Sequence, residues 1–262
     1  MKVAFWNGAG LSGGVSDYMA AIGVTLALVH NCKVVLGSTY ISNHKLQDYF
    51  SSNIKEEGVA HVPYLYLHGS SEYYTSLWDM KRSRQGNILE VPMEGVTIIH
   101  PPEVTEKKVF YYEVPQTTFY LLDIAGENSK AFQSALDEAE MVVVFLSMNV
   151  TEIQNFFQRF SLLIPKTLFI LKVFQQKSTV SRCKFSIEYG INIRNIGTFS
   201  HNKEFEEACE EGRLESFLRS GLSKSTKEPV YKFISNLKSI TNLLYERGSY
   251  EQTEGGEHGK WI

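Results

Sequence analysis

The chain has 262 residues, enough for one large α/β domain or two small ones. Its composition is 43% hydrophobic and 21% charged, which excludes a disordered or low-complexity protein. The 26 basic and 29 acidic residues give a net charge of −3, which does not favour a nucleic-acid coat protein or a membrane-surface binder. The three cysteines are scattered, so a disulfide framework is not expected. We predict a cytoplasmic protein, because the sequence shows neither the apolar core of a signal peptide nor an apolar run of ~20 residues.

Short apolar runs alternate along the chain with segments of helical periodicity. Residues 3–6 predict a first strand, and residues 16–29 predict a helix because Met19, Ile22 and Leu26 recur at helical spacing. Further strands are expected at residues 33–36, 96–99, 118–122, 141–146, 167–171 and 193–196. Further helices are expected at residues 45–50, 129–138, 150–160, 179–189, 203–209 and 230–247.

This alternation predicts an α/β fold, a doubly wound and mostly parallel sheet of about seven strands with helices on both faces. Residues 1–247 are predicted to form a single domain. Within it, residues 53–94 are expected to be an irregular insertion of short helices and loops. Residues 248–262 are rich in glycine and glutamate and are predicted to be a mobile tail.

A glycine-rich segment joins the first strand to the first helix. It reads NGAGLSGGVS over residues 7–16. Glycines in such a loop let successive backbone N–H groups contact phosphate oxygens at a helix N-terminus. The residues that we predict to contact a nucleotide in this loop are Gly8, Ala9, Gly10, Leu11, Ser12, Gly13, Gly14, Val15 and Ser16.

The loop departs from the phosphate-binding pattern GxxxxGK[ST] at its two charged or metal-binding positions. Gly8 and Gly13 match the two glycines, but Gly14 replaces the lysine and Val15 replaces the hydroxyl residue that holds Mg²⁺. Ser16, one residue further, can supply a metal-binding hydroxyl if the register shifts by one. The alternative interpretation is an ordinary glycine-rich turn.

The predicted strand at residues 118–122 ends in a second motif of phosphate sites. Asp123 follows the strand, and Gly126 completes a DxxG pattern. In P-loop proteins an aspartate at this strand end receives a metal-bound water, and the glycine frees a backbone N–H for the γ-phosphate. An aspartate here is also a common turn or cap residue. The combination with the glycine loop favours a phosphate-binding origin.

The succession of these motifs resembles the ParA/MinD group of P-loop ATPases, which includes the pilus-assembly localisation protein TadZ. The segments that carry the resemblance are KVAFW at 2–6, the glycine loop, Ala20 and Ala21, YLLDIAG at 120–126, AEMVVV at 139–144, and NIGTFSHNKEF at 195–205 followed by Ala208 and Gly212. The resemblance implies a P-loop NTPase-like fold over residues 1–246. It implies weak binding of ATP or ADP with Mg²⁺, Ser16 and Asp123 as metal ligands, and Gly126 and Ser200 as nucleotide contacts. Asp123 is the Walker B-like candidate for catalysis.

Further positions depart from the group's pattern. The group's early signature lysine, which reaches across a nucleotide-sandwich dimer, falls near Ala9. Ser200 stands where the group has a proline beside the adenine, and Lys172 where an asparagine ends a strand near the base. Together with Gly14 and Val15, these departures predict a pseudo-ATPase that requires no cofactor.

The leading hypothesis is therefore a scaffold or localisation factor, of a pilus-assembly or partitioning type, that acts through protein partners and possible homodimers. Nucleic-acid binding is expected to be weak or absent, since the only basic cluster is KRSR at residues 81–84. A second hypothesis is a working ATPase that uses nucleotide-dependent dimerisation as a switch. A third is a binding module that retains the fold without the nucleotide.

Overall fold

The structure is a computed structural model that describes part of the chain. The described residues are 1–8, 15–38, 48–50, 64–67, 88–90, 96–99, 119–124, 130–147, 149–173, 181–223 and 229–254. Of the predicted site residues, those at 9–14 and Gly126 lie outside these ranges, as does the basic cluster at 81–84.

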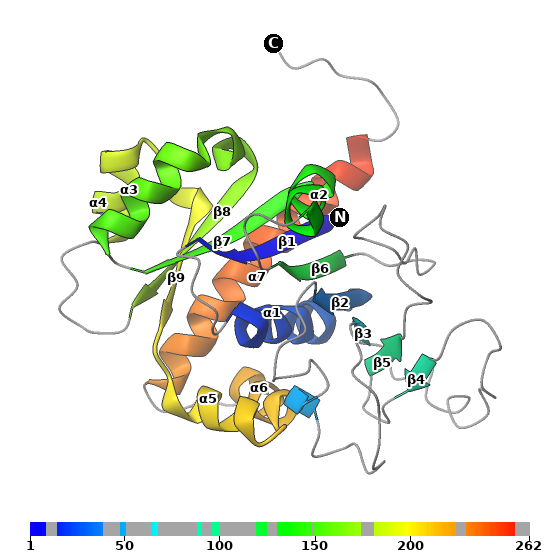
Figure 1. The fold of residues 1–262 in the computed structure, drawn as a ribbon. Helices are drawn as coiled ribbons and strands as arrows, with labels where there is room; N and C mark the ends of the chain where they lie inside the picture. The colour runs from blue at the N-terminus through cyan, green and yellow to red at the C-terminus, as the bar shows by residue number, and fades with distance from the viewer. Residues whose placement is uncertain are drawn as a thin grey trace.

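One mixed sheet forms the centre of the molecule (Figure 1). In the described part of the chain it has nine strands in the order β4-β5-β3-β2-β6-β1-β7-β8-β9. The six strands from β2 to β9 in this order are parallel, and β3, β5 and β4 continue the sheet in antiparallel pairs. The bounds are β1 Lys2–Asn7, β2 Val34–Ser38, β3 Tyr64–Leu67, β4 Ile88–Glu90, β5 Val96–Ile99, β6 Phe119–Ile124, β7 Met141–Ser147, β8 Thr167–Val173 and β9 Ile196–Ser200.

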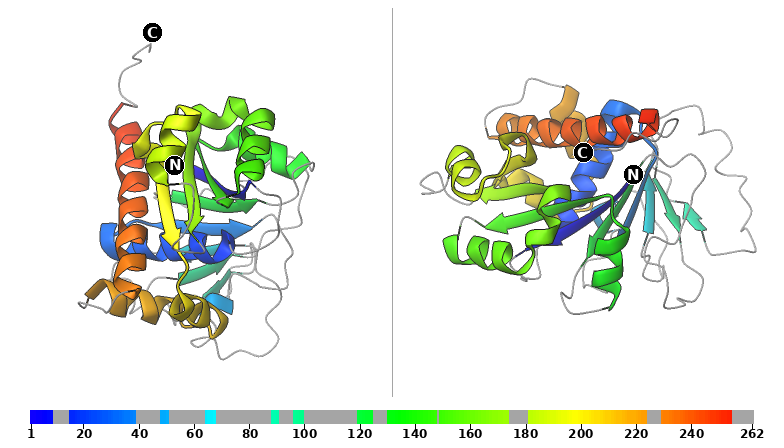
Figure 2. Two further views of the ribbon diagram at one scale, coloured as in Figure 1. Left: turned by 90° about the vertical axis from the view of Figure 1, so that its left-hand side faces the viewer. Right: turned by 90° about the horizontal axis from the view of Figure 1, so that it is seen from above.

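Helices cover both faces of the sheet, so that the domain has three layers (Figure 2). On one face lie α1 (Val15–His30), α5 (Lys203–Glu210), α6 (Leu214–Ser223) and α7 (Val230–Glu254). On the other face lie α2 (Lys130–Glu138), α3 (Val150–Arg159) and α4 (Arg182–Tyr189). Two short 3₁₀ helices, η4 (Ser161–Lys166) and η5 (Ile193–Asn195), precede β8 and β9.

The central strands are buried on both sides because their alternate side chains enter different cores. Val3 and Phe5 of β1 face the core beneath α1, which we call the α1-side core. Ala4 and Trp6 face the core beneath α2 and α3, the α2-side core. All but the last residue of β7 are buried, as the apolar run at residues 141–146 predicted.

Helix α1 is buried nearly all round, because it lies between the sheet and two other helices. Ten of its sixteen residues are buried, including Met19, Ile22 and Leu26 of the predicted stripe. The helix contacts β1, β2 and β6 on one side and α6 and α7 on the other. It therefore holds a fixed position relative to the ends of the strands.

Three sequence predictions about the sheet need correction. The parallel part has six strands rather than seven within the described residues, because the strand predicted at 96–99 joins the sheet as antiparallel β5. Within 53–94, predicted as helices and loops, the described residues 64–67 and 88–90 are strands β3 and β4; they have four and three residues, too few to show a periodicity. The strand predicted at 193–196 begins at Ile196, because Asn192 caps η5 through the N–H of Arg194.

Two helical predictions also differ from the structure. Helix α6 had no predicted counterpart, although Leu214, Leu218 and Gly221 are buried at helical spacing. Helix α7 continues to Glu254, seven residues past the predicted domain boundary. Among the described residues no helix is both long and apolar enough to cross a membrane.

Packing of α7 on β9 yields a stability test. A Cβ added to Gly197 would lie 2.8 Å from Ile170 Cδ1 and 2.8 Å from Ile240 Cγ1, so a side chain must push α7 away from the sheet. We expect Gly197→Val to lower the free energy of unfolding by about 1–3 kcal/mol, measured by chemical denaturation. Thr198→Val, at the next and partly exposed position, is the matched control and should change it by less than about 0.5 kcal/mol.

Candidate functional site

The carboxyl ends of β1 and β6 lie next to each other at one edge of the sheet. The two strands pair in parallel, with Phe5 opposite Asp123. After β1, the backbone N–H of Gly8 donates to the carbonyl of Phe145 in β7 at 3.0 Å. Ligand crevices of open α/β sheets form outside this edge, so the position fits a ligand site.

A hydrogen bond joins the start of α1 to the end of β6. The hydroxyl of Ser16, the second residue of α1, donates to Oδ2 of Asp123. Val15, the first residue of the helix, is buried at 5% exposure. The side chain that meets Asp123 is therefore Ser16, which is the arrangement that a one-residue shift of the loop register requires.

Asp123 is a buried carboxyl group, with 9% of its surface exposed. Burial raises its pKa to about 6 because desolvation disfavours the charged form. The hydrogen bond from Ser16 and the positive charge of Lys172 act in the opposite direction, while the negative charge of Asp17 raises the pKa further. Asp123 is thus poised to bind or release a proton near neutral pH.

Lys172 brings a positive charge to the same edge from β8. Its ammonium group lies 5.3 Å from the ring centroid of Phe145 and 5.6 Å from that of Tyr18. Burial lowers its pKa, whereas the charges of Asp17 and Asp123 raise it. The sequence analysis noted Lys172 only as a departure from a family pattern and did not place it near Asp123.

An aromatic cluster supports this group of charges from the α1 side. The ring of Tyr18 lies 5.4 Å from Phe145, 4.8 Å from Phe199 and 5.3 Å from Phe205, measured between centroids. Burial, together with the charges of Glu206 and Asp17, raises the pKa of Tyr18. This cluster joins β7, β9, α1 and α5 beside the lysine, at spacings typical of packed aromatic pairs.

Asp17 has its own buried partner, which sequence reasoning missed. The hydroxyl of Tyr49 donates to the carboxylate of Asp17, and burial raises the pKa of Tyr49. Asp17 can be recognised in the sequence as an acidic residue in the first turn of a helix, where it interacts favourably with the helix dipole. Tyr49 carries no such signal, since residues 48–50 are far from α1 in sequence.

The remaining predicted site residues are placed as follows. Gly8 packs against β7, where an added Cβ would lie 2.9 Å from Leu146 Cδ2 and 2.9 Å from Val144 Cγ1, so close packing already requires a glycine there. Ser200 ends β9, opposite Val173 and four strands away from β6. Of the predicted contacts that the structure describes, Ser16 bonds to Asp123 and Val15 precedes it in α1.

The same part of the chain contains no group of three or more His, Cys, Asp or Glu side chains that could hold a metal ion. Ser16 and Asp123 supply two oxygen ligands. Mg²⁺ is commonly bound by one or two carboxylates together with substrate phosphates and water, so this donor set fits Mg²⁺ only as the companion of a phosphorylated ligand.

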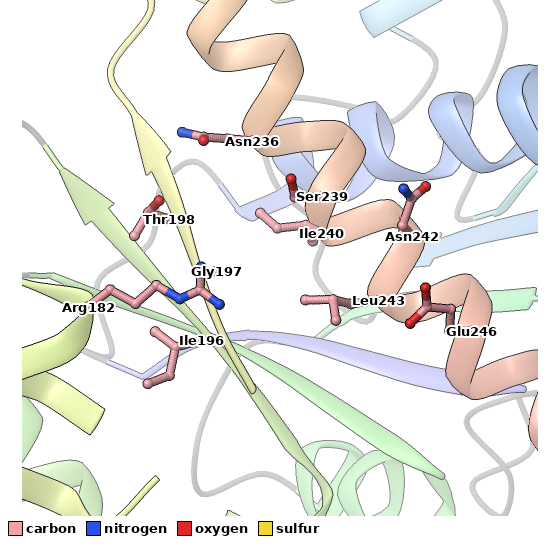
Figure 3. A pocket seen from close by; sticks show the side chains of 10 residues that line it. All are labelled: Arg182, Ile196, Gly197, Thr198, Asn236, Ser239, Ile240, Asn242, Leu243 and Glu246. Carbon is pink, nitrogen blue, oxygen red and sulfur yellow. The ribbon is translucent and has the colours of Figure 1, made fainter. Parts of the chain in front are cut away.

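A hollow of about 330 Å³ lies away from this site, between α4, β9 and α7 (Figure 3). Its lining consists of Arg182, Ile196, Gly197, Thr198, Asn236, Ser239, Ile240, Asn242, Leu243 and Glu246. The guanidinium of Arg182 donates to the carbonyl of Ile193 at 2.6 Å, so this cation is already held by η5. The hollow contains none of the predicted site residues.

Comparison with known proteins gives similarity in structure alone. No protein-family model matches the chain, and no curated protein matches it in sequence. The MinC:MinD cell division complex of Aquifex aeolicus superposes with a TM-score of 0.62 at 14% identity, covering 100% of this chain and 98% of that chain. This chain has the fold of the ParA/MinD P-loop ATPases.

Further structures with the ParA/MinD fold agree. A putative plasmid partition protein of Borrelia burgdorferi bound to AMPPNP gives a TM-score of 0.58 at 14% identity, over 94% of this chain and 99% of that one. MinD of Pyrococcus horikoshii, complexed with Mg-ADP, gives 0.58 at 14% identity, over 93% and 98%. The predicted P-loop NTPase-like α/β fold is thereby confirmed.

The raised pKa of Asp123 yields a test of the site's electrostatics. A carboxyl group whose pKa is raised by folding stabilises the protein below its unfolded pKa, and this contribution is lost as the pH rises through about 6. We expect Asp123→Asn to be more stable than the wild type at pH 8 by about 2 kcal/mol, and the difference to shrink by pH 4. Asparagine keeps an acceptor for Ser16.

Denaturant midpoints at pH 4, 6 and 8 measure this difference. Asp137→Asn, at an exposed position of α2, is the control and should remain close to the wild type at each pH. A stability difference between Asp123→Asn and the wild type that is the same at pH 4 and pH 8 would show that Asp123 is not desolvated.

Proposed function

We propose that this ParA/MinD-fold protein is a cytoplasmic pseudo-ATPase that acts as a scaffold or localisation factor through protein partners. The observation that carries the proposal is the pair formed by Ser16 and Asp123, taken together with a glycine-rich loop whose sequence contains no lysine. The pair retains the oxygen groups of a nucleotide site, while Gly14 and Val15 stand where the cation and an adjacent hydroxyl are expected.

The loss of the lysine bears on catalysis more than on binding. A phosphoryl transition state spreads negative charge over the transferred group, and enzymes neutralise it with a lysine, Mg²⁺ and aligned donors. Backbone N–H groups at the start of α1 can still attract an anion. The site is therefore expected to bind ATP or ADP weakly and not to turn ATP over.

Two comparison structures support a nucleotide as the ligand. The partition protein of B. burgdorferi was solved with AMPPNP, and MinD of P. horikoshii with Mg-ADP. If the same site is used here, Ser16 and Asp123 would hold Mg²⁺ beside the phosphates. The ion would supply charge neutralisation, and the chain's own residues would orient the phosphates.

A role through protein partners is supported by a structure of the same fold that was solved with a second protein. MinD of A. aeolicus was solved in complex with MinC, a second protein. A pilus-assembly or partitioning role of the TadZ type belongs to this proposal. Homodimerisation is also part of it, but the sandwich dimer that depends on a signature lysine is not, because Ala9 stands near that position.

One observation favours the second hypothesis, a working ATPase with a nucleotide-dependent dimer switch. Ser16 is in contact with Asp123, so the metal-binding hydroxyl is retained at a position one residue from the expected one. Of the two residues that the loop has replaced, an active enzyme would then lack only the lysine. Hydrolysis decides between the two hypotheses.

We expect the purified protein to release no phosphate from ATP above background, with or without Mg²⁺. A single well-placed transition-state donor contributes about 10²–10³-fold in rate, and the loop lacks at least one. Phosphate release in multiple- and single-turnover assays measures this. Asp123→Asn is the matched variant: any turnover that it leaves unchanged comes from a contaminant, and turnover that disappears in it would establish an active ATPase.

A further inference from the structure

Lys172 is placed to do more than pair with carboxylates in the protein. By the alternation of β8, in which Ile170 faces the α1-side core and Leu171 the α2-side core, Lys172 projects toward α1. Its ammonium lies over the rings of Phe145 and Tyr18, the latter in the first turn of α1. Lys172, which lies on β8, thus reaches α1, the helix that follows the glycine loop without a lysine.

Neighbouring negative charges attract the ammonium of Lys172 to the site, while its side chain remains partly exposed. Asp17 and Asp123 both attract its ammonium, and Asp123 is the residue bonded to Ser16 at the start of α1. Lys172 itself is only partly buried. A flexible four-carbon stem with a strongly hydrated point charge at its end suits binding to phosphate, and cation–π contacts are weak enough to let the ammonium move to an anion.

The end of the neighbouring strand provides a second donor. Asn202 follows β9 by two residues, and its Oδ1 accepts the backbone N–H of Phe205 at 2.8 Å, which caps α5. Its Nδ2 is buried and has no hydrogen-bond partner among the residues that the structure describes; the side chain as a whole is 3% exposed. A buried donor without an acceptor is costly, so Asn202 also favours a ligand that brings acceptor atoms.

Asn202 and Lys172 are linked through one aromatic contact. Phe205, whose N–H Asn202 caps, packs 5.3 Å from Tyr18, the ring beneath the Lys172 ammonium. Lys172 and Phe199 are also opposite one another in the pairing of β8 with β9. The two donors therefore belong to one end of the β8–β9 pair.

Resting on the proposed function, we infer that Lys172 is the phosphate-binding cation of this site and replaces, from β8, the lysine that the glycine loop lacks. The ligand class is a phosphorylated anion, either the polyphosphate of a nucleotide or an inorganic polyphosphate. Asn202 is a supporting donor to the same ligand. Gly14 then marks a cation that is supplied from another strand rather than one that is missing.

Calorimetric titrations of five proteins test this inference. They are the wild type, Lys172→Met, Lys172→Arg, Asn202→Asp and Lys238→Met, each titrated with ATP, inorganic tripolyphosphate and adenosine, in Mg²⁺ and in EDTA. Lys172→Met keeps the length of the stem and removes the charge. Asn202→Asp keeps the capping oxygen, replaces the donor by an acceptor and adds a negative charge. Lys238, exposed on α7, is the matched control.

We expect Lys172→Met to weaken binding of ATP and tripolyphosphate at least tenfold, with Lys172→Arg closer to the wild type and Lys238→Met equal to it. Asn202→Asp should weaken both ligands, and the heat from adenosine should not change in any variant. A wild type that binds ATP but not tripolyphosphate selects the nucleotide as the source of the phosphates. Melting temperatures without ligand separate a folding defect from a binding defect, and Lys172→Arg keeps the test available if Lys172→Met does not fold.

Two results would overturn the inference. One is equal affinity of the wild type and Lys172→Met for ATP and tripolyphosphate. The other is a wild type that binds neither of these ligands. Both leave the proposed scaffold function standing, because that function fails on a different result, the Asp123-dependent hydrolysis of ATP.

Discussion

The parallel pairing of β1 with β6 is the constraint on which the candidate site depends. It sets Phe5 opposite Asp123, so the carboxyl end of β6 lies beside the strand that leads to α1. Helix α1 is fixed in turn by burial between the sheet and α6 and α7, and its second residue, Ser16, donates to Asp123. Two residues 107 positions apart in sequence thus meet because two strands and one helix are packed without freedom to shift.

Much of this arrangement could be predicted from the sequence. The apolar run of β7, the helical spacing of Met19, Ile22 and Leu26 in α1 and the strand–loop–helix order at the N-terminus are local patterns, and the structure confirms the α/β fold that they indicate. The antiparallel extension could not be predicted, because β3 and β4 are too short for a periodic signal and their pairing is a long-range property. Helix α6 had a readable spacing at Leu214 and Leu218 and was overlooked.

Sequence reasoning missed part of the candidate site for a different reason. Motif spacing located Ser16 and Asp123, since both lie next to glycine patterns that can be read along the chain. Lys172 and Tyr49 lie on other elements, and nothing in their local sequence links them to Asp123. Their roles arise from tertiary packing, which brings the end of β8 and residues 48–50 toward the first turn of α1. The sequence showed Lys172 only as a departure from a family pattern, whereas in the structure its ammonium lies over Tyr18 and is attracted by Asp17 and Asp123.

Electrostatics at the sheet edge connect fold to function. The carboxylate of Asp123 and the ammonium of Lys172 share a partly dehydrated space with Asp17, so the proton affinities of Asp123 and Lys172 depend on the charges around them. An arriving anion would find Lys172 and the helix N-terminus attractive and the carboxylates of Asp17 and Asp123 repulsive. Protonation of Asp123, whose pKa is about 6, or binding of Mg²⁺ would reduce the repulsion. Weak and conditional binding without turnover is the behaviour that this balance of charges favours.

The most direct test is the titration of the Asp123 carboxyl carbon by NMR in protein labelled with ¹³C-aspartate. We predict a pKa near 6 for the signal of Asp123, which is identified by its absence in Asp123→Asn. We also predict a higher pKa of Asp123 in Ser16→Ala and in Lys172→Met, because each variant removes a group that stabilises the carboxylate. A pKa close to the ordinary 3.8, unchanged by both variants, would contradict the claim that these three side chains share one buried site.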